Sequence, residues 1–363
     1  MSEREQAARR RRPSMRDVAQ AAGVSVATVS YSFNNPDRVS EEARRKVFDA
    51  VDELGFVVNS AARSMKTGGA TGVGIVVGDI AQTFSIGVVR GAQTGARERG
   101  LSLLIANGDT HTREQARYVD LFDQERLKGI ILSPVHDSSA DIEKLRRHGS
   151  RVVVVNYHSR PGYHCTVLMD NDDVGYRAAQ HLFEVGARRL AFAAGATTLQ
   201  PIVERRQGIR RAVAEQPGAS LLELDRERVE LEDGISIAEE ILALAAEERP
   251  DGIVAATGFM ARGIIDTLTA SGIAVPEEVA LISTEENTRA WDGPIRISRM
   301  REPAFELGRQ AALLLADEIA EGDAHVHRTI VLHADLVATE STLGLTPLPG
   351  RPAAPPPSQD AHA

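Results

Sequence analysis

Cysteine is nearly absent from this sequence, and long apolar runs are missing altogether. Cys165 is the single cysteine among 363 residues, so no disulfide can form within the chain, which fits a reducing compartment. No apolar run reaches the length of a membrane span. The charged N-terminus is not followed by the apolar segment of a secretory signal. We therefore expect a cytoplasmic protein with no membrane partner, rather than an exported solute receptor.

Motifs of common enzyme classes are also missing. The sequence has no Gly-x-Ser-x-Gly nucleophile elbow and no phosphate-cradling loop. Gly72-x-Gly74 with Gly78 is similar to a nucleotide-binding fingerprint, but these glycines lie within and after a strand-like run instead of opening a helix. Nothing in the sequence calls for an enzyme, and we expect no catalytic residues.

Three histidines near the C-terminus raise the question of a metal. His325, His327 and His333 are close in sequence, but no carboxylate or cysteine completes a ligand set at a familiar spacing. We therefore expect neither a metal nor another cofactor, and we expect Cys165 to be inert.

Charge is divided unevenly along the chain. Residues 1–66 carry 12 Lys+Arg against 9 Asp+Glu, whereas the remainder carries 30 against 42. A basic run, Arg9 to Arg12, opens this first part. An acidic body with a basic head indicates that only the head meets a polyanion such as DNA, although a basic run is also typical of a solvated tail.

Residues 15 to 66 have the pattern of short amphipathic helices. Ser14, Ser25 and Ser40 are suitable N-caps, and Gly23 and Gly55 are suitable stops. Four residues in the first helix and four in the third form apolar stripes. These residues are Met15, Val18, Ala19 and Ala22, and then Ala43, Val47, Val51 and Leu54. Residues 34–37, Asn-Asn-Pro-Asp, predict a turn.

The second helix separates a buried face from an outward one. Val29 and Phe33 share the face predicted to be buried, and Val26, Ala27 and Tyr31 look outward. A helix of this size fits the major groove with its N-terminal residues towards base edges. Hydroxyls suit phosphate oxygens, so Thr28 and Ser30 are phosphate candidates. The alternative is a helix-turn-helix used only for protein contacts.

The remainder of the chain alternates strands with helices. Strand-like runs without polar alternation predict parallel sheets covered on both faces. They occupy residues 72–77, 101–106, 129–133, 151–156 and 166–170, and then 189–194, 221–225, 251–256 and 279–283. Helical stretches lie near 85–99, 111–125, 138–148 and 172–185, and then near 202–215, 234–247, 259–271 and 303–320. Two such series predict two doubly wound lobes, with ligands in the cleft at the carboxyl ends of the strands.

Over residues 15–344 the chain resembles the LacI/GalR family of bacterial transcription regulators. The head carries the most specific motifs, which are Asp17-Val18-Ala19, Ala22-Gly23-Val24-Ser25, Ala27-Thr28-Val29-Ser30, Asn34, Val39-Ser40 and Leu54-Gly55-Phe56. The body adds Gly129-Ile130-Ile131, Asp170-Asn171, Arg205 with Gly208, residues 275–279, residues 303–308 and Glu340-Ser341-Thr342. The resemblance implies an all-α helix-turn-helix head plus an α/β two-lobed periplasmic-binding-protein-like body with two doubly wound parallel sheets.

The resemblance also implies a homodimer that binds double-stranded DNA at a pseudo-palindromic operator. Such a protein would be associated with the nucleoid and would have no membrane partner. A dimer is favoured over a tetramer because no leucine-heptad helix follows residue 345. Tyr31 stands where relatives more often have Arg, so a bidentate guanine contact is lost. Met65 replaces the Leu wedge of the hinge, either entering the minor groove or packing on its dimer mate. We expect DNA contacts from Arg16, Ser25, Val26, Ala27, Thr28, Ser30, Tyr31, Asn34, Asn59, Ala62 and Met65.

Members of this family bind a small-molecule effector between the lobes, which here implies Phe84, Asp170, Arg205, Thr257 and Glu285. Arg205 suits a polar or carboxylate ligand, with a structural ion pair to a neighbouring acid as the alternative. The usual Asn-Pro-Phe is Gln-Thr-Phe at 82–84, and the usual Asn-Asp is Thr257-Gly258. The position of the stacking aromatic aligns with Val229. We therefore expect an effector other than a typical hexose, or a regulator without a ligand switch.

The predicted organisation follows from these patterns. The DNA-binding domain spans 13–57, the hinge and linker 58–70, the effector-binding and dimerisation domain 71–344, and a Pro/Ala-rich tail 345–363. The N-lobe is expected at about 71–170 and 301–327, and the C-lobe at about 171–300 and 328–344. The function implied is a sequence-specific transcriptional regulator, a repressor, against the rivals of a solute receptor and an enzyme. A sequence-specific shift on DNA discriminates against both rivals.

Overall fold

The chain divides into two compact units, residues 1–70 and 71–363, which we call the head and the body. The computed structural model describes residues 13–56, 72–108, 112–134, 136–158, 162–195, 199–286 and 295–343. Among these residues, no helix is both long enough and apolar enough to cross a lipid bilayer.

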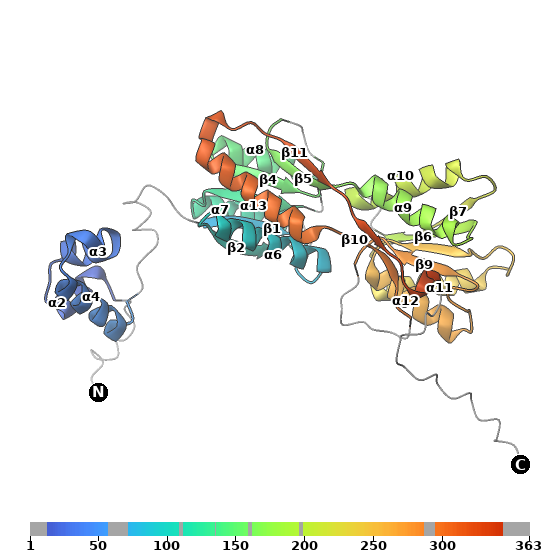
Figure 1. Ribbon diagram of the computed structural model, residues 1–363, viewed down its shortest axis with the longest axis horizontal. Coiled ribbons are helices and arrows are strands. Elements are labelled where there is room, and N and C mark those ends of the chain that lie inside the picture. Colours follow the sequence, from blue (N-terminus) through green and yellow to red (C-terminus); the bar gives the residue numbers. More distant parts are fainter. Residues whose placement is uncertain are drawn as a thin grey trace, which may run out of the picture. The chain divides into compact units, whose positions relative to one another are not determined.

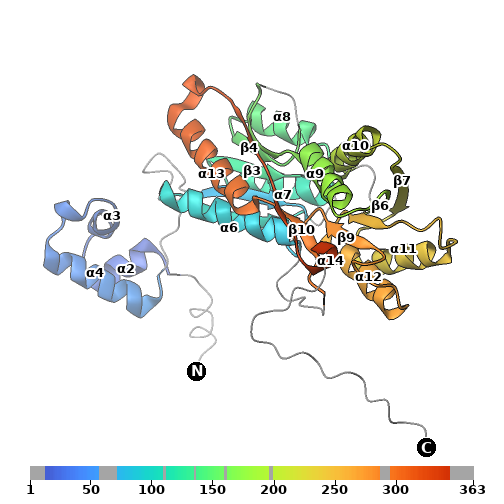
Figure 2. The same cartoon turned by 45° about the vertical axis from the view of Figure 1, so that its right-hand side comes forward.

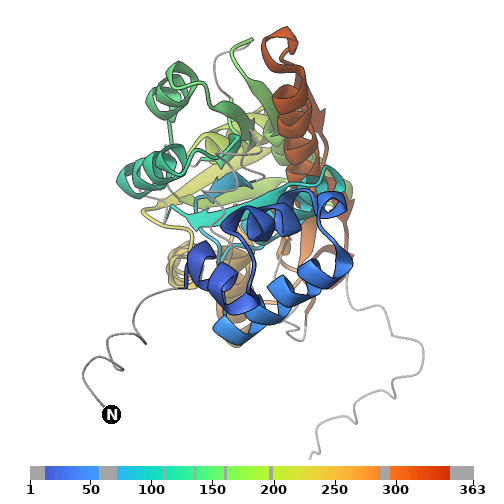
Figure 3. The ribbon, with the colours of Figure 1, turned by 90° about the vertical axis from the view of Figure 1, so that its left-hand side faces the viewer.

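Within residues 13–56, the described part of the head, the chain forms a cluster of three α-helices with one short 3-10 turn (Figures 1 and 3). Its elements are α2 (Met15–Ala22), α3 (Val26–Asn34), η1 (Pro36–Arg38) and α4 (Glu41–Leu54). Each α-helix begins at the serine that the sequence predicts, since the hydroxyls of Ser14, Ser25 and Ser40 each accept a backbone N–H from the first turn. Helices α2 and α4 end at Gly23 and Gly55, which have φ of 65° and 61°.

A small apolar core holds the head together. Val18, Val29 and Val47 come from three different helices and are fully buried. Phe33 is half-buried, and its ring packs edge-on against Phe48 with centroids 5.5 Å apart. The predicted buried face of the second helix is therefore confirmed. The turn predicted at residues 34–37 begins later, because α3 extends through residue 34 and the 3-10 turn follows it.

The N-lobe of the body is a six-stranded sheet in the order β11-β5-β4-β3-β1-β2, with every pairing parallel (Figure 1). Its strands are β1 (Gly72–Val77), β2 (Ser102–Asn107), β3 (Gly129–Ser133), β4 (Arg151–Val155), β5 (Cys165–Met169) and β11 (Thr329–Leu332). Its helices are α6 (Thr83–Glu98), α7 (Thr112–Gln124), α8 (Ser139–Arg147) and α13 (Ala304–Glu321).

Helices cover both faces of this sheet, as the apolar strand runs predict. Ile75 and Val77 of β1 join one core cluster with side chains of α6 and α13, whereas Val76 joins the second cluster with α7 and α8. Figure 2 shows α6 and α13 lying side by side on their face of the sheet. The alternation of strand side chains between the two clusters explains why β3 is buried along its whole length.

The C-lobe repeats this architecture with the strand order β12-β10-β9-β8-β6-β7. Its strands are β6 (Arg189–Gly195), β7 (Ser220–Arg226), β8 (Gly252–Ala255), β9 (Ala280–Ser283), β10 (Ser298–Arg301) and β12 (Asp335–Val337). Its helices are α9 (Asn171–Glu184), α10 (Gln200–Glu215), α11 (Leu231–Ala243), α12 (Gly258–Ala270) and α14 (Glu340–Leu343). Strand β12 runs antiparallel to β10, and the other pairings are parallel.

The chain passes between the lobes three times, after β5, after β10 and after β11. The last passage corrects the boundary predicted at 327/328, because residues 329–332 pair with β5 in the N-lobe sheet. Strands β10, β11 and β12 also escaped the sequence analysis. Strands β10 and β12 contain charged residues, and β11 and β12 are partly exposed, so they lack the buried apolar runs that mark most of the other strands.

Glycines set the close approach of α9 and α10. A Cβ on Gly208 would collide with the backbone carbonyl of Asp172, and a Cβ on Gly175 would collide with the carbonyl of Arg205. The two helices therefore touch backbone to backbone at this crossing. Because Gly208 lies one turn after Arg205, this contact also brings Arg205 to the start of α9.

Candidate functional sites

The outward face of α3 carries the predicted base-reading residues. Val26 and Tyr31 are 43% and 41% exposed, which is unusual for large hydrophobic residues, and Ala27 is exposed beside them. Arg16 is exposed on α2. An exposed helix with apolar and aromatic side chains at its surface is suited to thymine methyls and base edges in a major groove.

The two hydroxyl candidates differ from each other. Ser30 is only 7% exposed, since at about 100° per residue it turns towards the core beside Val29, and its contact with a phosphate stays a prediction. Thr28 is half-buried, and its hydroxyl lies 2.9 Å from the hydroxyl of the N-cap Ser25. These two hydroxyls and the N–H groups of the first turn of α3 remain at the helix N-terminus, where a phosphate oxygen is favoured.

Some predicted DNA contacts fall outside what the structure describes. Asn34 is the last residue of α3, and its side chain is not among the described groups. Asn59, Ala62 and Met65, the predicted hinge contacts, lie outside the described residues. Their roles stay predictions.

Arg205 is the centre of the region between the lobes. It is 1% exposed on α10, and its Nε donates to Oδ1 of Asn171 at 3.1 Å. Its Nη1 donates to Oε1 of Glu285 at 2.9 Å, and its Nη2 donates to Oε1 of Glu302 at 3.1 Å. Asn171 follows the first passage between the lobes, and Glu302 lies at the second. The guanidinium of Arg205 therefore links these two passages by hydrogen bonds to Glu285, which lies after β9.

Two more protein acceptors complete the surroundings of this guanidinium. Nη1 also donates to the hydroxyl of Thr284 at 3.1 Å and to the carbonyl oxygen of Ala256 at 3.3 Å. The ion pair with neighbouring acids, which the sequence left open as the alternative role of Arg205, is therefore present. A ligand that binds Arg205 has to displace or share one of these acceptors.

Glu302 was missed by the sequence analysis. Its carboxyl is buried, and burial together with the nearby charge of Glu285 raises its pKa to about 8, against the opposing effect of Arg205. Two carboxylates that share one guanidinium in a buried site cannot both be ionised cheaply, so the site favours the protonated form of Glu302 more than water does. No local pattern marks it in the sequence, where it stands between a strand end and Pro303.

The other predicted effector residues lie at the same edge of the sheets. Asp170 caps α9, and its Oδ1 accepts the N–H of Asp173 at 3.0 Å. Thr257 caps α12 and is buried, with its hydroxyl donating to the carbonyl of Val229 at 2.8 Å. Phe84 is half-buried in the first turn of α6 and packs on the main core cluster. Thus Arg205 and Glu285 are in direct contact. Asp170 Oδ1 and the Thr257 hydroxyl instead accept backbone N–H groups in the first turns of α9 and α12.

A further contact joins the lobes beside this network. The backbone N–H of His158, after β4, donates to Oε1 of Gln200 on α10 at 2.6 Å. The imidazole Nε2 of His158 lies 3.6 Å from Oε1 of Glu204, which is also on α10. Burial raises the pKa of Glu204, while His158 and a hydrogen bond from Asn171 act in the opposite direction. Sequence analysis missed these residues because the partners are more than 40 positions apart.

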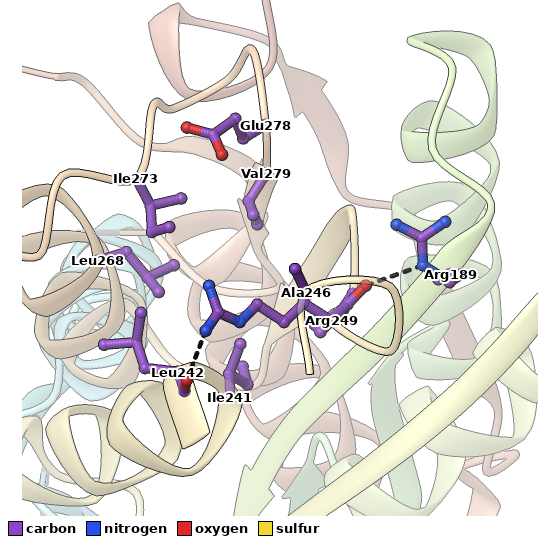
Figure 4. A pocket seen from close by; sticks show the side chains of 10 residues that line it. Arg189, Ile241, Leu242, Ala246, Arg249, Leu268, Ile273, Glu278 and Val279 are labelled. Atoms are coloured by element: carbon purple, nitrogen blue, oxygen red, sulfur yellow. Dashed lines mark hydrogen bonds between the residues drawn. The ribbon is translucent and has the colours of Figure 1, made fainter. Parts of the chain in front are cut away.

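A pocket of about 240 Å³ lies on the opposite edge of the C-lobe. It is lined by residues before or at the start of β6, β8 and β9, among them Arg189, Pro250 and Val279. Figure 4 shows the guanidinium of Arg249 lying across it, with Nη2 donating to the carbonyl of Leu242 at 2.6 Å. Ligands of doubly wound sheets bind at the carboxyl ends of the strands, so this pocket is not the expected effector site.

The three histidines that raised the question of a metal do not meet. His333 is exposed, with Nδ1 3.7 Å from Oδ2 of Asp173. His325 and His327 instead meet Cys165, and the three donor atoms lie within 4.8 Å of one another. The fold therefore brings a cysteine to two of these histidines from 160 residues away in the sequence, a contact that no familiar spacing indicates.

Family models match both parts of this architecture. The model described as bacterial regulatory proteins, lacI family, matches residues 14–59. The model described as a periplasmic binding protein-like domain matches residues 179–342. A helix-turn-helix head followed by a two-lobed ligand-binding body defines a class of DNA-binding transcriptional regulators.

Similar proteins identify the family within this class. The HTH-type transcriptional regulator CelR of Thermobifida fusca is 32% identical over 351 residues, covering 92% of this chain and 99% of CelR. The HTH-type transcriptional repressor PurR of Vibrio atlanticus is 26% identical, covering 89% and 96%. The chain belongs to the LacI family of bacterial transcriptional regulators, and its relatives are regulators rather than enzymes.

Solved structures agree with this placement. A structure of a CelR–cellobiose complex has a TM-score of 0.66 at 29% identity, covering 91% of this chain and all of that one. The Lac repressor dimer bound to operator and the anti-inducer ONPF has a TM-score of 0.78 at 20% identity, covering 92% and 100%. The second likeness shows the fold, which confirms the predicted helical head and two-lobed body.

Proposed function

We propose that this LacI-family regulator is a repressor that binds a pseudo-palindromic operator as a homodimer in the cytoplasm. The observation that carries the proposal is the exposed face of α3, where Val26, Ala27 and Tyr31 face solvent on a capped helix. Twofold symmetry of a dimer would be matched by twofold symmetry of the operator. A structure of the Lac repressor, which has this fold, holds a dimer on an operator.

An exposed sheet edge supports the dimer. Strand β2 lies at the end of the N-lobe sheet, and its Leu104 and Ile105 are exposed there. Ile86 of α6 adds a further exposed apolar side chain. Long apolar edge strands are normally covered, because their unpaired backbone groups and side chains promote association. A second copy of the chain would cover this edge.

Two variants of the head test the proposed roles in DNA binding. Tyr31→Ala should alter the preferred operator sequence, because Tyr31 faces the base edges in this proposal. Arg16→Ala should weaken binding to all sequences alike and reduce the slope of log affinity against log salt by roughly 1, as the loss of one phosphate contact does. Arg262→Ala, on α12 of the body, serves as the control and should change neither. Identical selectivity profiles for the two head variants would show that the roles are assigned wrongly.

We further propose that a small molecule in the inter-lobe cleft modulates this DNA binding, and that it is not a simple hexose. The proposed site offers Arg205 and Glu285, but the guanidinium is already surrounded by protein acceptors and the hydroxyl of Thr257 donates to the carbonyl of Val229. A ligand that closes the lobes would shift the spacing of the two heads, in either direction. A regulator without a ligand switch is the alternative.

Calorimetry on the full chain separates these possibilities. The panel includes simple hexoses and cellobiose, the ligand named for the CelR complex. Tight binding of a hexose would refute the proposed selectivity. Binding of another ligand that Arg205→Met abolishes would support the cleft as the effector site, and no binding across a broad metabolite panel would favour the regulator without a switch.

A further inference from the structure

Three chemically distinctive side chains meet at the amino ends of β5 and β11. Cys165 is the first residue of β5, and His325 and His327 lie in the segment between the 3-10 turn η2 (Gly322–Ala324) and β11. The strands are paired from Thr166 and Thr329 onwards. This pairing holds the thiol and the two imidazoles together although they are about 160 residues apart in the chain.

The donor atoms have the separation of ligands around one ion. The Sγ of Cys165 lies 3.1 Å from Nε2 of His325 and 3.9 Å from Nδ1 of His327. A tetrahedral zinc with Zn–S of about 2.3 Å and Zn–N of about 2.0 Å places its sulfur and nitrogen ligands about 3.5 Å apart. The two observed distances lie on either side of this value, and the two nitrogen donors lie within 4.8 Å of each other.

A carboxylate orients one of the imidazoles. The Nδ1 of His325 lies 2.7 Å from Oε2 of Glu321, one turn before it at the end of α13. This contact places the ring proton on Nδ1 and leaves the lone pair of Nε2 directed at the thiol. Metal-binding histidines commonly have such a carboxylate partner, which fixes the ring and increases its basicity.

Glu318 brings a carboxyl group to the cluster. It is buried on α13, and among the described residues none hydrogen-bonds its Oε2. Two cations also act on the cluster. They are Arg151, which pairs with Asp323 at 3.0 Å, and Arg146, which lies over the ring of Tyr163.

A metal bound at the cluster would replace the proton of the Cys165 thiol, which passes to solvent as the sulfur–metal bond forms.

We propose that Cys165, His325 and His327 form a zinc-binding site, with the fourth position of the ion open to water. A thiolate and two imidazoles are a ligand set that Zn²⁺ prefers, whereas Mg²⁺ and Ca²⁺ prefer oxygen ligands. The site lies at the amino edge of the N-lobe sheet, the edge opposite to the effector cleft. It would clamp β5, the segment before β11 and the end of α13 together.

The test uses the full chain without a polyhistidine tag, stripped with a chelator and titrated with Co²⁺ and then Zn²⁺. We expect one Co²⁺ per chain, with d–d bands of tetrahedral cobalt and a sulfur-to-cobalt charge-transfer band that Zn²⁺ abolishes. Saturating Zn²⁺ should raise the melting temperature by roughly 5 °C at 100 times its Kd. Glu321→Gln should weaken the affinity about 10-fold to 100-fold, because it orients His325 without binding the ion.

Matched variants decide between a site and adventitious binding. Cys165→Ser should lose the charge-transfer band, and His327→Gln, at a half-buried position, should lose most of the affinity while keeping the circular dichroism of the stripped protein. His333→Gln removes an exposed histidine that follows the other end of β11 and pairs with Asp173, and this variant should bind as the wild type does. The proposal is overturned if the wild type shows no thiolate–cobalt band, or if Cys165→Ser and His327→Gln bind Co²⁺ as the wild type does.

Discussion

Replacing Arg205 with methionine should destabilise the body strongly, because this guanidinium joins both early passages between the lobes to β9. Methionine has a similar length but makes none of the five hydrogen bonds of the guanidinium. Removing one partner of a buried ion pair costs about 3–5 kcal/mol. Glu285 is partly exposed and can rehydrate, and Glu302 can hold a proton, so we expect the lower end, about 3 kcal/mol.

Scanning calorimetry of the full chain measures this effect. For a body of this size, about 3 kcal/mol corresponds to a decrease in melting temperature of roughly 6–12 °C. Arg210→Met is the matched control on the same helix, since its side chain is 59% exposed and its ion pair with Glu223 lies at the surface, where such pairs contribute about 0–1 kcal/mol. A melting temperature of Arg205→Met equal to that of Arg210→Met would refute the role of Arg205 as the tie between the lobes.

Three further predictions follow from the same structure. The pKa of Glu302 is about 8 in the folded chain, above its ordinary value of 4.5, so its contribution to stability is complete below about pH 4.5 and is lost as pH rises through about 8. Glu302→Gln should therefore show a smaller decrease in melting temperature between pH 5 and pH 8 than the wild type, and an equal decrease would contradict the assignment. Gly208→Ala should cost about 1–3 kcal/mol in denaturant unfolding, because the new methyl group meets the carbonyl of Asp172; an unchanged midpoint would show that α9 and α10 move apart freely. Ile105→Glu should convert the dimer to a monomer in sedimentation equilibrium, and a dimer that persists would exclude the β2 edge as the interface.

Local patterns predict most of the fold. The caps Ser14, Ser25 and Ser40 act within one helical turn, and the apolar strand runs reflect burial on both faces, so both features can be derived from short windows of sequence. Strands β10 and β12 contain charged residues and β11 is partly exposed, so no buried apolar run marks them. Burial of Ser30 was also missed, because a position on the flank of a three-helix core depends on how neighbouring helices cross.

The sites depend on contacts that no local pattern contains. Arg205 was found through a family resemblance, yet its pairing with Glu302 requires α10 to meet the passage after β10. Glu318 and Glu321 lie on one apolar-faced helix, and nothing in that helix indicates a cluster with Cys165. These groups meet because parallel pairing of β5 with β11 joins distant segments.

The central claim is that the head reads a specific DNA sequence, and a selection of bound fragments from the source genome tests it most directly. We would run it with the full chain at about 0.1–0.2 M salt, where non-specific binding is suppressed. The account predicts that the recovered fragments share a pseudo-palindromic motif with a flexible pyrimidine–purine step at its centre, and that Tyr31→Ala changes the half-sites of that motif. Fragments without a common motif, both with and without added cell extract as a source of effector, would contradict the account.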